Sequence, residues 1–386
     1  MNSFVENENS IKKNFTLDEL ERYKRHLSLK EIGYKGQLKL KKSSVLFIGA
    51  GGIGSSALIY VAAAGIGKIG IADNDLVETS NLQRQVIHSH LNVGSKKVDS
   101  AKETIKELNP HCEIKTYKER INSSNILKII QEYDLICDCS DNFGTRYLIN
   151  DACLIIKKPF IFGSVQGFQG QVAVFNLNKN SPNLRDLLPY SPSNKDIPSC
   201  SEFGVIGVST GLIGILQANE IIKIIANQGD VLDGKILNFD LLTLSMKKLN
   251  LKPDFKNKQI NNLSDFSNDY EDLSALRKEI TCSQLEKKYK KNRDHIIVID
   301  VREKEEFNKL YLEGSISLPL SIFEDSKSLK IIKKNCFNKE IFTLCKSGKR
   351  SIKATQILNK LNIESKSIAG GIEQLKEFNT TFNIIN

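Results

Sequence analysis

The sequence predicts an α/β fold in two domains: a large first domain with a mostly parallel sheet, and a smaller α/β domain after it. The short apolar run Ser44–Ile48 leads directly into a glycine-rich turn and a helix, which is how a parallel βαβ unit begins. The polar stretch 251–272 has too few apolar residues for a helix or a strand. Buried-type strands follow it at 296–300 and 341–344. We therefore expect a first domain at 1–250, a linker at 251–272 and a second domain at 273–386.

The first domain is expected to alternate strands and helices after a helical lead-in at Leu17–Leu40. A helix over Ser55–Ala64 is expected to end at Gly65, and a strand at Lys68–Ala72 closes the βαβ unit just before Asp73. This spacing is typical of a Rossmann-like sheet that binds a mononucleotide. The elements expected next are a helix at 96–108, a strand at 134–139, a helix at 142–156, and strands at 160–162 and 172–175.

Three further segments complete the expected organisation. The stretch Asn178–Phe203 is polar and contains several prolines, so we expect a surface loop, and it carries Cys200. An apolar helix is expected at Gly211–Ile225. In the second domain, a helix at Ser351–Leu361 is expected to start just after a cysteine loop at 345–351.

Composition excludes several classes of protein. The 386 residues carry a formal net charge of +10, but the lysines are spread along the chain with no basic-aromatic motif, so we expect a solvated basic surface and no nucleic-acid partner. The eight cysteines are irregularly spaced, which indicates a reducing compartment. No apolar signal core and no run of eighteen apolar residues occurs, so no membrane association is expected. The abundance of Lys, Asn and Ile suggests AT-rich DNA, and hence a plastid stroma, with the cytoplasm as the alternative.

The glycine turn alone leaves two chemistries open. Gly49, Gly51, Gly52 and Gly54 allow backbone N–H groups to approach a phosphate at a helix N-terminus. The same pattern occurs in NAD-dependent dehydrogenases, where Asp73 would bind the adenosine ribose.

Charged residues after successive elements favour phosphoryl-type transfer over hydride transfer. Arg84 and Lys97 could neutralise a triphosphate and the charge that grows at its α-phosphorus. Asp141 could hold Mg²⁺ on the leaving pyrophosphate. A dehydrogenase needs none of these three side chains.

At these residues the chain resembles the MoeB/ThiF family of ubiquitin-activating-like adenylyltransferases. The motifs that carry the resemblance occur in the family's order, from 17 to 248: Arg22-Tyr23-Lys24-Arg25, the glycine turn, Ser80-Asn81-Leu82-Gln83-Arg84-Gln85, Asp138-Cys139-Ser140-Asp141-Asn142 and Gly170-Gln171. The resemblance implies ATP-dependent adenylylation of the C-terminal glycine carboxylate of a ubiquitin-fold sulfur-carrier protein, with release of pyrophosphate.

The resemblance also implies a role for each matching residue. Gly52 contacts the nucleotide, Asp73 binds the ribose, and Asp141 serves Mg²⁺. Arg25 matches an arginine that, in such enzymes, reaches across a homodimer interface into the nucleotide site of the other subunit. The phosphate ligands implied are Asn81, Arg84 and Lys97.

One feature of the family is missing. Members commonly bind structural Zn²⁺ through two CxxC pairs, but Asn183 and Asp186 stand at the first pair and no cysteine occurs in 252–258, so we expect no zinc site. Cys137 and Cys139 alternate on an expected buried strand and are interpreted as core packing. Cys200 resembles a loop cysteine that some relatives use in thioester or disulfide chemistry, and an incidental thiol is the equal alternative.

The second domain resembles a rhodanese, a single-domain sulfurtransferase, from about residue 279 to the end. The motifs are Val298-Ile299-Asp300-Val301-Arg302, Glu306-Phe307, Glu313-Gly314, the Cys345 loop and Gly370-Gly371. Loop N–H groups and the N-terminus of the next helix would stabilise a Cys345 thiolate and its persulfide. The resemblance implies sulfur transfer from a persulfide or thiosulfate donor, through Cys345, to the activated carrier.

The sequence leaves open which carrier protein is the substrate. The small subunit of molybdopterin synthase is the favoured carrier, which would place the enzyme in molybdenum cofactor biosynthesis, while thiamine and tRNA-thiolation carriers use the same chemistry. An NAD-dependent oxidoreductase and a non-catalytic scaffold that binds a ubiquitin-fold partner are the remaining alternatives.

Overall fold

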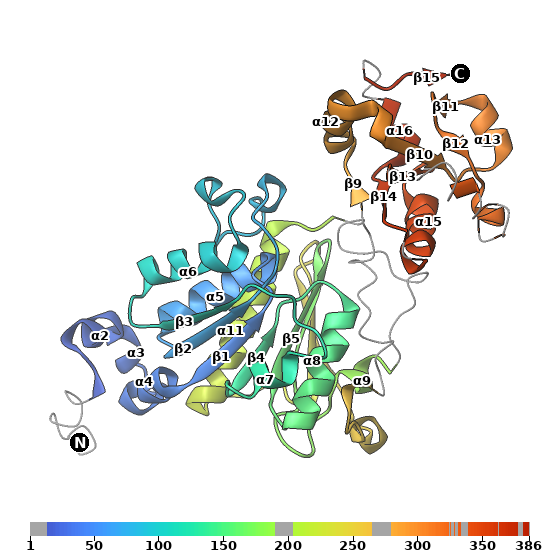
Figure 1. Ribbon diagram of the computed structural model, residues 1–386. Coiled ribbons are helices and arrows are strands. Elements are labelled where there is room, and N and C mark those ends of the chain that lie inside the picture. Colours follow the sequence, from blue (N-terminus) through green and yellow to red (C-terminus); the bar gives the residue numbers. More distant parts are fainter. Residues whose placement is uncertain are drawn as a thin grey trace, which may run out of the picture. The chain divides into compact units, whose positions relative to one another are not determined.

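The computed structural model describes residues 14–189, 204–264, 279–323, 325, 328, 331–332, 339–361, 363–376 and 381–385. The chain divides into two compact units between residues 272 and 273, each with its own sheet (Figure 1). The expected α/β class, with a mostly parallel sheet in the large domain and a smaller α/β domain after it, is confirmed.

The first unit, as described, is built on an eight-stranded sheet in the order β3-β2-β1-β4-β5-β6-β7-β8. The pairings from β3 to β5 are parallel, and those from β5 to β8 are antiparallel. Its strands are β1 (Ser44–Ile48), β2 (Lys68–Ala72), β3 (Glu113–Tyr117), β4 (Leu135–Asp138), β5 (Phe160–Gln166), β6 (Gln169–Phe175), β7 (Lys235–Asp240) and β8 (Ser245–Asn250).

Helices cover both faces of this sheet (Figure 1). The helices are α2 (Leu17–Arg22), α3 (Lys24–Leu27), α4 (Gly33–Lys42), α5 (Gly52–Ala64), α6 (Lys97–Leu108), α7 (Ile126–Ile130), α8 (Phe143–Ile156), α9 (Leu184–Leu187) and α11 (Gly207–Ala226). Alternation along β1 separates two cores: Val45 and Phe47 pack with α5 and α11, whereas Leu46 and Ile48 pack with α7 and α8. Apolar strand residues buried on both faces account for the parallel part of the sheet.

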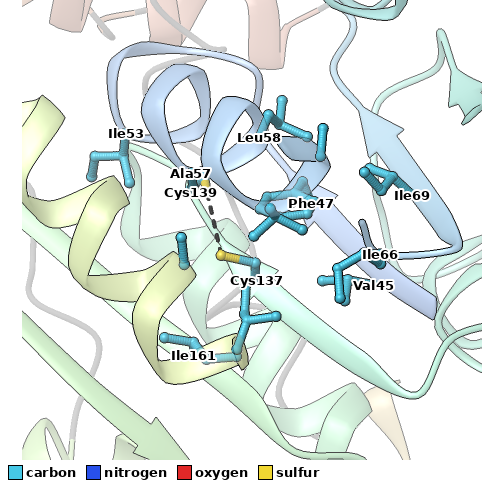
Figure 2. Close-up of a cluster of buried hydrophobic side chains, with 14 of the residues drawn as sticks. Val45, Phe47, Ile53, Ala57, Leu58, Ile66, Ile69, Cys137, Cys139 and Ile161 are labelled. Atoms are coloured by element: carbon cyan, nitrogen blue, oxygen red, sulfur yellow. Dashed lines mark hydrogen bonds between the residues drawn. The ribbon is translucent and has the colours of Figure 1, made fainter. Parts of the chain in front are cut away.

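The strand β4 contributes two cysteines to the first of these cores. Cys137 and Cys139 point to one face, where Figure 2 shows them among Val45, Phe47 and Ile161. Their sulfurs lie 3.7 Å apart, and burial raises the pKa of Cys137 well above its ordinary value. The interpretation of this pair as core packing is confirmed.

The helix α11 has the length and hydropathy of a membrane span, and it is the one described helix that does. It nevertheless packs on α5 and β5. Gln217 is fully buried and donates to the Asp138 carbonyl, and Glu220 accepts from the Leu232 N–H group. Its position is that of a core helix.

Several boundaries differ from expectation, among them the following three. The helix α5 starts at Gly52 instead of Ser55, because the second half of the glycine turn is itself helical. The segment 178–203 contains the short helix α9, and its residues 190–203 lie outside the described residues. In the stretch expected to be linker, Ile260 and Leu263 are buried, and η3 (Phe255–Lys258) forms one helical turn. Apolar burial therefore keeps residues 251–264 with the first unit.

The second unit contains a parallel five-stranded sheet in the order β12-β10-β13-β14-β9, within the described residues. A two-stranded ribbon, β11 (Tyr311–Leu312) with β15 (Ile384–Ile385), joins it. The remaining elements are β9 (Glu279–Ile280), β10 (Ile296–Asp300), β12 (Ile316–Ser317), β13 (Glu340–Leu344), β14 (Ser365–Ile368), α12 (Cys282–Asn292), α13 (Lys304–Lys309), α15 (Lys349–Lys360) and α16 (Gly371–Leu375).

Candidate functional site

The glycine turn joins β1 to α5, and its shape depends on two glycines. Gly49 has φ 106°, and a Cβ there would lie 2.6 Å from the Cys139 carbonyl oxygen at the end of β4. A Cβ on Gly54 would lie 2.2 Å from the Gly49 carbonyl oxygen. Any larger residue at either position would push the turn out of place, so the N-terminus of α5 keeps a compact backbone surface suited to a phosphate.

Two side chains hold Ala50 inside this turn. Asp73, directly after β2, accepts the Ala50 N–H at 2.8 Å through Oδ2 and the Asp75 N–H at 2.9 Å through Oδ1. The carbonyl of Ala50 lies 3.0 Å from His88 Nε2, which must be the donor because a carbonyl only accepts. The other ring nitrogen of His88 lies 2.8 Å from Ser100 Oγ. The turn is therefore fixed from both sides.

The sequence analysis gave no role to His88, because a histidine followed by Ser89 and His90 matches no known ligand or catalytic spacing. The structure shows a buried imidazole whose two nitrogens are both hydrogen-bonded. Burial lowers the pKa of His88, and the nearby Lys97 charge lowers it further. The imidazole is thus neutral at physiological pH and serves to position the turn.

The expected phosphate ligands lie on the segment after β2 and at the start of α6. Lys97 is the first residue of α6, with its ammonium 2.8 Å from Asp75 Oδ2. Asn81 is buried and accepts the Glu78 N–H group, and Arg84 donates to the Ser80 carbonyl at 3.0 Å. These local bonds shape the segment 78–84.

Gln85, the last residue of the Ser80–Gln85 motif, also lies next to the glycine turn, and the sequence analysis gave it no role. A Cβ on Gly51 would lie 3.7 Å from Gln85 Nε2, so the amide borders the glycine turn. Gln85 is buried, and its Oε1 has no hydrogen-bond partner among the described residues. On the other side, a Cβ on Gly207 would meet the Gln83 carbonyl at 2.5 Å, so α11 begins against this segment.

The loop after β4 contributes carboxylates at the same sheet edge. Asp138 is fully buried, and its Oδ1 accepts the Ser140 N–H and hydroxyl groups. Burial raises the pKa of Asp138, and the two bonds to Ser140 shape the start of the loop after β4. Asp141 is exposed, just before Asn142, which caps α8 by accepting the Thr145 N–H.

Strand order explains why Asp73, the glycine turn and Asp141 lie at the same edge of the sheet. The strands β2, β1 and β4 are neighbours in the sheet, and Asp73, the glycine turn and Asp141 follow their carboxyl ends. Ligands of open α/β sheets bind at this edge. The structure thus brings the turn, Asp73 and Lys97 into one connected cluster, whereas no direct contact between Asp141 and Arg84 is recorded among the described residues.

The donor set at this edge fits Mg²⁺ bound mainly through substrate phosphates. Within the described part of the chain, no group of three or more His, Cys, Asp or Glu side chains could hold a metal ion. Mg²⁺ needs only one or two carboxylates when phosphates and water supply the rest. An exposed carboxylate such as Asp141 satisfies that requirement.

Arg25 lies far from its own glycine turn. It is exposed on α3, next to Tyr23, whose ring would lie 2.5 Å from a Cβ on Gly65. Gly65 caps the C-terminal end of α5, and a 13-residue helix is about 20 Å long. Arg25 therefore sits near the end of α5 opposite the turn.

Asn183 and Asp186, which stand where family members have the first CxxC pair, belong to a hydrogen-bond network. Asn183 and Asp186 form a capping box at the start of α9. Asp186 Oδ1 also accepts the Asp254 N–H and the Asn257 amide, both at 2.8 Å. The carboxylate of Asp186 thereby ties the segment at 182–188 to the segment at 254–257.

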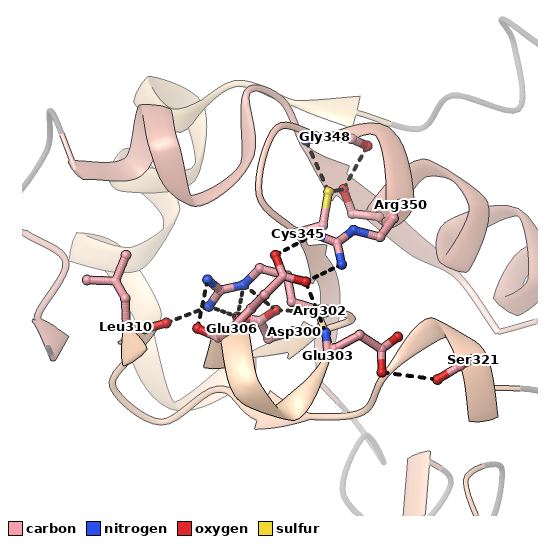
Figure 3. Close-up of polar contacts among 10 residues, drawn as sticks. Asp300, Arg302, Glu303, Glu306, Leu310, Ser321, Cys345, Gly348 and Arg350 are labelled. Atoms are coloured by element: carbon pink, nitrogen blue, oxygen red, sulfur yellow. Dashed lines mark hydrogen bonds and ion pairs between the residues drawn. The ribbon is translucent and has the colours of Figure 1, made fainter. Parts of the chain in front are cut away.

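The cysteine loop of the second unit follows β13 and leads into α15. Cys345 is buried, and its sulfur accepts the Gly348 N–H at 3.1 Å, with the Ser351 hydroxyl at 3.5 Å (Figure 3). Gly348 has φ 95° and is the N-cap of α15. The sulfur therefore lies at a helix N-terminus, next to a backbone N–H donor and a hydroxyl group. The expected setting of Cys345 is present, whereas Cys200 lies outside the described residues.

Two comparisons of sequence give the families of the two units. Residues 23–260 match the ThiF family, and residues 281–378 match the rhodanese-like domain. A probable molybdopterin-synthase adenylyltransferase of Gracilaria tenuistipitata var. liui is 39% identical over 91% of this chain and 96% of its own length. The adenylyltransferase and sulfurtransferase MOCS3 of Aedes aegypti is 36% identical over 92% of this chain and 86% of its own length.

Solved structures share the fold of the first unit. The crystal structure of E. coli MccB with MccA-N7isoASN has a TM-score of 0.56 at 20% identity and covers 64% of this chain and 78% of its own. The crystal structure of PaaA has a TM-score of 0.55 at 22% identity, with 66% and 78% covered. Taken with the two family matches, the chain belongs to the ThiF family, carries a C-terminal rhodanese-like domain, and is an enzyme of the nucleotidyltransferase class.

Proposed function

We propose that this enzyme adenylylates the C-terminal glycine of a ubiquitin-fold sulfur-carrier protein and then delivers sulfur to that glycine from a persulfide on Cys345. The observation that carries the proposal is the presence, in one chain, of a glycine turn braced by Asp73 and a buried cysteine sulfur at the N-terminus of α15. The family assignment favours nucleotidyl transfer over hydride transfer, so the oxidoreductase alternative has no support.

In the first step, a carboxylate oxygen of the carrier attacks the α-phosphorus of ATP. The bond from that phosphorus to its bridging oxygen breaks, and pyrophosphate leaves with the electron pair. Gly49, Gly51, Gly52 and Gly54 present N–H groups and close backbone to the nucleotide. Asp73 binds the ribose, and the phosphate ligands are Asn81, Arg84 and Lys97. Asp141 would hold Mg²⁺, which would neutralise charge on the leaving pyrophosphate.

In the second step, the terminal sulfur of the Cys345 persulfide attacks the acyl carbon. The acyl–oxygen bond breaks, AMP leaves, and an acyl disulfide joins the carrier to Cys345. A second thiolate then attacks the Cys345 sulfur, so that the carrier leaves as thiocarboxylate and a disulfide remains for a thiol reductant to reset. Cys200 is the candidate for that second thiol within this chain.

The proposal also covers the oligomeric state, the carrier, the sulfur donor and the compartment. The enzyme acts as a homodimer in which Arg25 serves the partner's nucleotide site, and it needs no zinc. The favoured carrier is the small subunit of molybdopterin synthase, and the sulfur donor is a persulfide or thiosulfate. The composition supports a reducing compartment, the plastid stroma or else the cytoplasm. Adenylylation belongs to the first unit, which includes residues 251–264 of the expected linker, and sulfur transfer belongs to the second unit.

The test is carrier-dependent exchange of labelled pyrophosphate into ATP, run with each purified candidate carrier. Exchange with one carrier and Mg²⁺, and none with a carrier that lacks its terminal glycine, is the expected result. Exchange without any carrier, or hydride transfer to NAD⁺ with no exchange, would overturn the proposal. Thiocarboxylate formation on the same carrier, followed by mass spectrometry, tests the second step.

A further inference from the structure

The cations of the cysteine loop are the obvious binding groups for an anionic sulfur donor. Arg350 is the second residue of α15, the helix that follows the cysteine loop, and its pKa is raised mainly by the hydrogen bonds to Glu306. An unpaired guanidinium next to the Cys345 loop would bind a small dianion such as thiosulfate through its charge and its paired N–H groups. Whether Arg350 is available for that task decides which donors the loop accepts.

The structure shows that Arg350 is already engaged. Its Nη2 donates to Glu306 Oε1 at 2.7 Å, and its Nη1 donates to the other carboxylate oxygen (Figure 3). This is a two-point ion pair, the strongest arrangement for these groups. The pair lowers the pKa of Glu306, because the bonds to Arg350 stabilise the carboxylate. Both side chains are about one-third exposed, so a bound donor could compete for the guanidinium.

Glu306 is itself held in place from a different part of the unit. It lies on α13, which follows β10. Arg302 forms a buried pair with Asp300 at the end of β10 and donates to the Glu306 and Leu310 carbonyls. The backbone of α13 is thus anchored to the sheet, and the Glu306 carboxylate is presented to the cysteine loop by a rigid support.

Other carboxylates border the same loop. Lys346 lies 3.6 Å from Glu373 on α16, and both side chains are more than half exposed. A Cβ on Gly348 would lie 4.0 Å from a carboxylate oxygen of Glu279. Thus Lys346 and Arg350 each have an acidic neighbour, and the surroundings of Cys345 carry less net positive charge than the loop sequence suggests.

We propose that Glu306 determines which sulfur donors the enzyme uses: by holding Arg350 in an ion pair, it weakens the binding of dianionic donors such as thiosulfate. The loop is left suited to a persulfide, whose terminal sulfur carries one negative charge. The inference rests on the proposed role of Cys345 as the sulfur acceptor, and it makes Glu306 a positioning residue that acts through Arg350.

The chemistry is the same for both donors. The Cys345 thiolate attacks the outer sulfur of the donor and forms a new S–S bond. The donor's own bond to that sulfur breaks, and sulfite leaves from thiosulfate, or a thiolate leaves from a persulfide. Only the charge of the donor and of its leaving group differs, so a change at Glu306 should separate the two.

The experiment compares the full-length enzyme with Glu306→Gln in sulfur transfer to cyanide. We expect the KM for thiosulfate to fall about 5-fold, the size of one freed, partly exposed charge interaction, with kcat changed less than about 2-fold. The KM for the persulfide of N-acetylcysteine methyl ester should stay within about 2-fold. The thiosulfate effect should shrink at high ionic strength, because salt screens partly exposed charges.

Two further variants separate this effect from general charge or folding changes. Glu305→Gln removes the same charge from an exposed position on α13, where no bond to Arg350 forms among the described residues, and should change the thiosulfate KM less than about 2-fold. In an Arg350→Gln background, Glu306→Gln should have no further effect. An unchanged thiosulfate KM in Glu306→Gln, an equal effect of Glu305→Gln, or an effect that survives without Arg350 overturns the inference. If no donor loads Cys345 in the wild type, the proposed function fails first and this inference falls with it.

Discussion

The ammonium of Lys97 lies 2.8 Å from Asp75 Oδ2, and only 8% of the Lys97 side chain is exposed, whereas 60% of the Asp75 side chain is. The lysine therefore approaches the nucleotide edge from within the protein, and its charge acts on His88, which braces the glycine turn. We propose that a bound phosphate replaces Asp75 as the partner of this buried cation.

Lys97→Met should lower carrier-dependent pyrophosphate exchange by ~10²-fold, because a charge that stabilises the transition state is lost. Asp75→Asn should lower exchange less than about 10-fold, since the exposed carboxylate orients the lysine without meeting the phosphate. Equal losses in the two variants would show that the ion pair is needed for folding alone. Circular dichroism of both variants supplies the folding control.

Arg84→Ala and Asp141→Ala should each lower the same exchange by ~10²-fold or more, because both side chains act on charge that develops in the transition state. The Asp141 variant should also shift the Mg²⁺ concentration needed for half-maximal exchange. Arg120→Ala, an exposed arginine after β3, is the matched control and should leave exchange unchanged. Full activity of Asp141→Ala would remove this carboxylate from the mechanism.

The purified enzyme should contain no stoichiometric zinc and should keep its melting temperature in the presence of a chelator. Asp186→Ala should destabilise the first unit by about 1–3 kcal/mol, because the N–H of Asp254 and the amide of Asn257 lose their shared acceptor. Asp230→Ala, at an exposed position, should be close to neutral. One zinc per chain in elemental analysis, or unfolding by chelation, would contradict this account.

The stability of the first unit should fall as the pH drops below about 6.5, and His88 should contribute to that fall. The folded state lowers the pKa of His88, mainly through burial, so neutral imidazole stabilises the fold above the ordinary value. This contribution is lost as the pH falls through the lowered pKa. Urea unfolding at pH 7.5 and 5.5 should show a smaller pH dependence in His88→Gln than in the wild type. An identical dependence would mean that other groups control acid stability.

Cys345→Ala should abolish sulfur transfer from thiosulfate or a persulfide and leave pyrophosphate exchange intact, since adenylylation uses no thiol. Cys200→Ala should leave persulfide formation on Cys345 unaffected and slow only the release of thiocarboxylate. Mass spectrometry of the carrier and of the peptide that contains Cys345 measures both steps. Full thiocarboxylate formation by Cys345→Ala with the same donor would make the second unit a bystander.

Both reactive motifs could be found from sequence because each depends on neighbours along the chain. Gly49 and Gly54 are needed by a turn of a few residues, and Cys345 obtains its donors from Gly348 and Ser351. Strand and helix positions were also accessible, since apolar periodicity follows from the backbone geometry of each element. The start of α5 at Gly52 departed from expectation because helical hydrogen bonds outweigh the weak helix propensity of glycine.

Contacts between distant residues were decided only by the tertiary structure. Arg350 meets Glu306 across 44 residues, Asp186 meets Asn257 across 71, and His88 meets Ala50 across 38. Each contact requires strand order and helix placement that no local pattern encodes, and the burial of Ile260 and Leu263 in an expected linker has the same cause. The sequence by itself therefore determined the two reactive motifs and the families to which they belong, while packing decided which side chains surround each motif, among them the Glu306 carboxylate that pairs with Arg350.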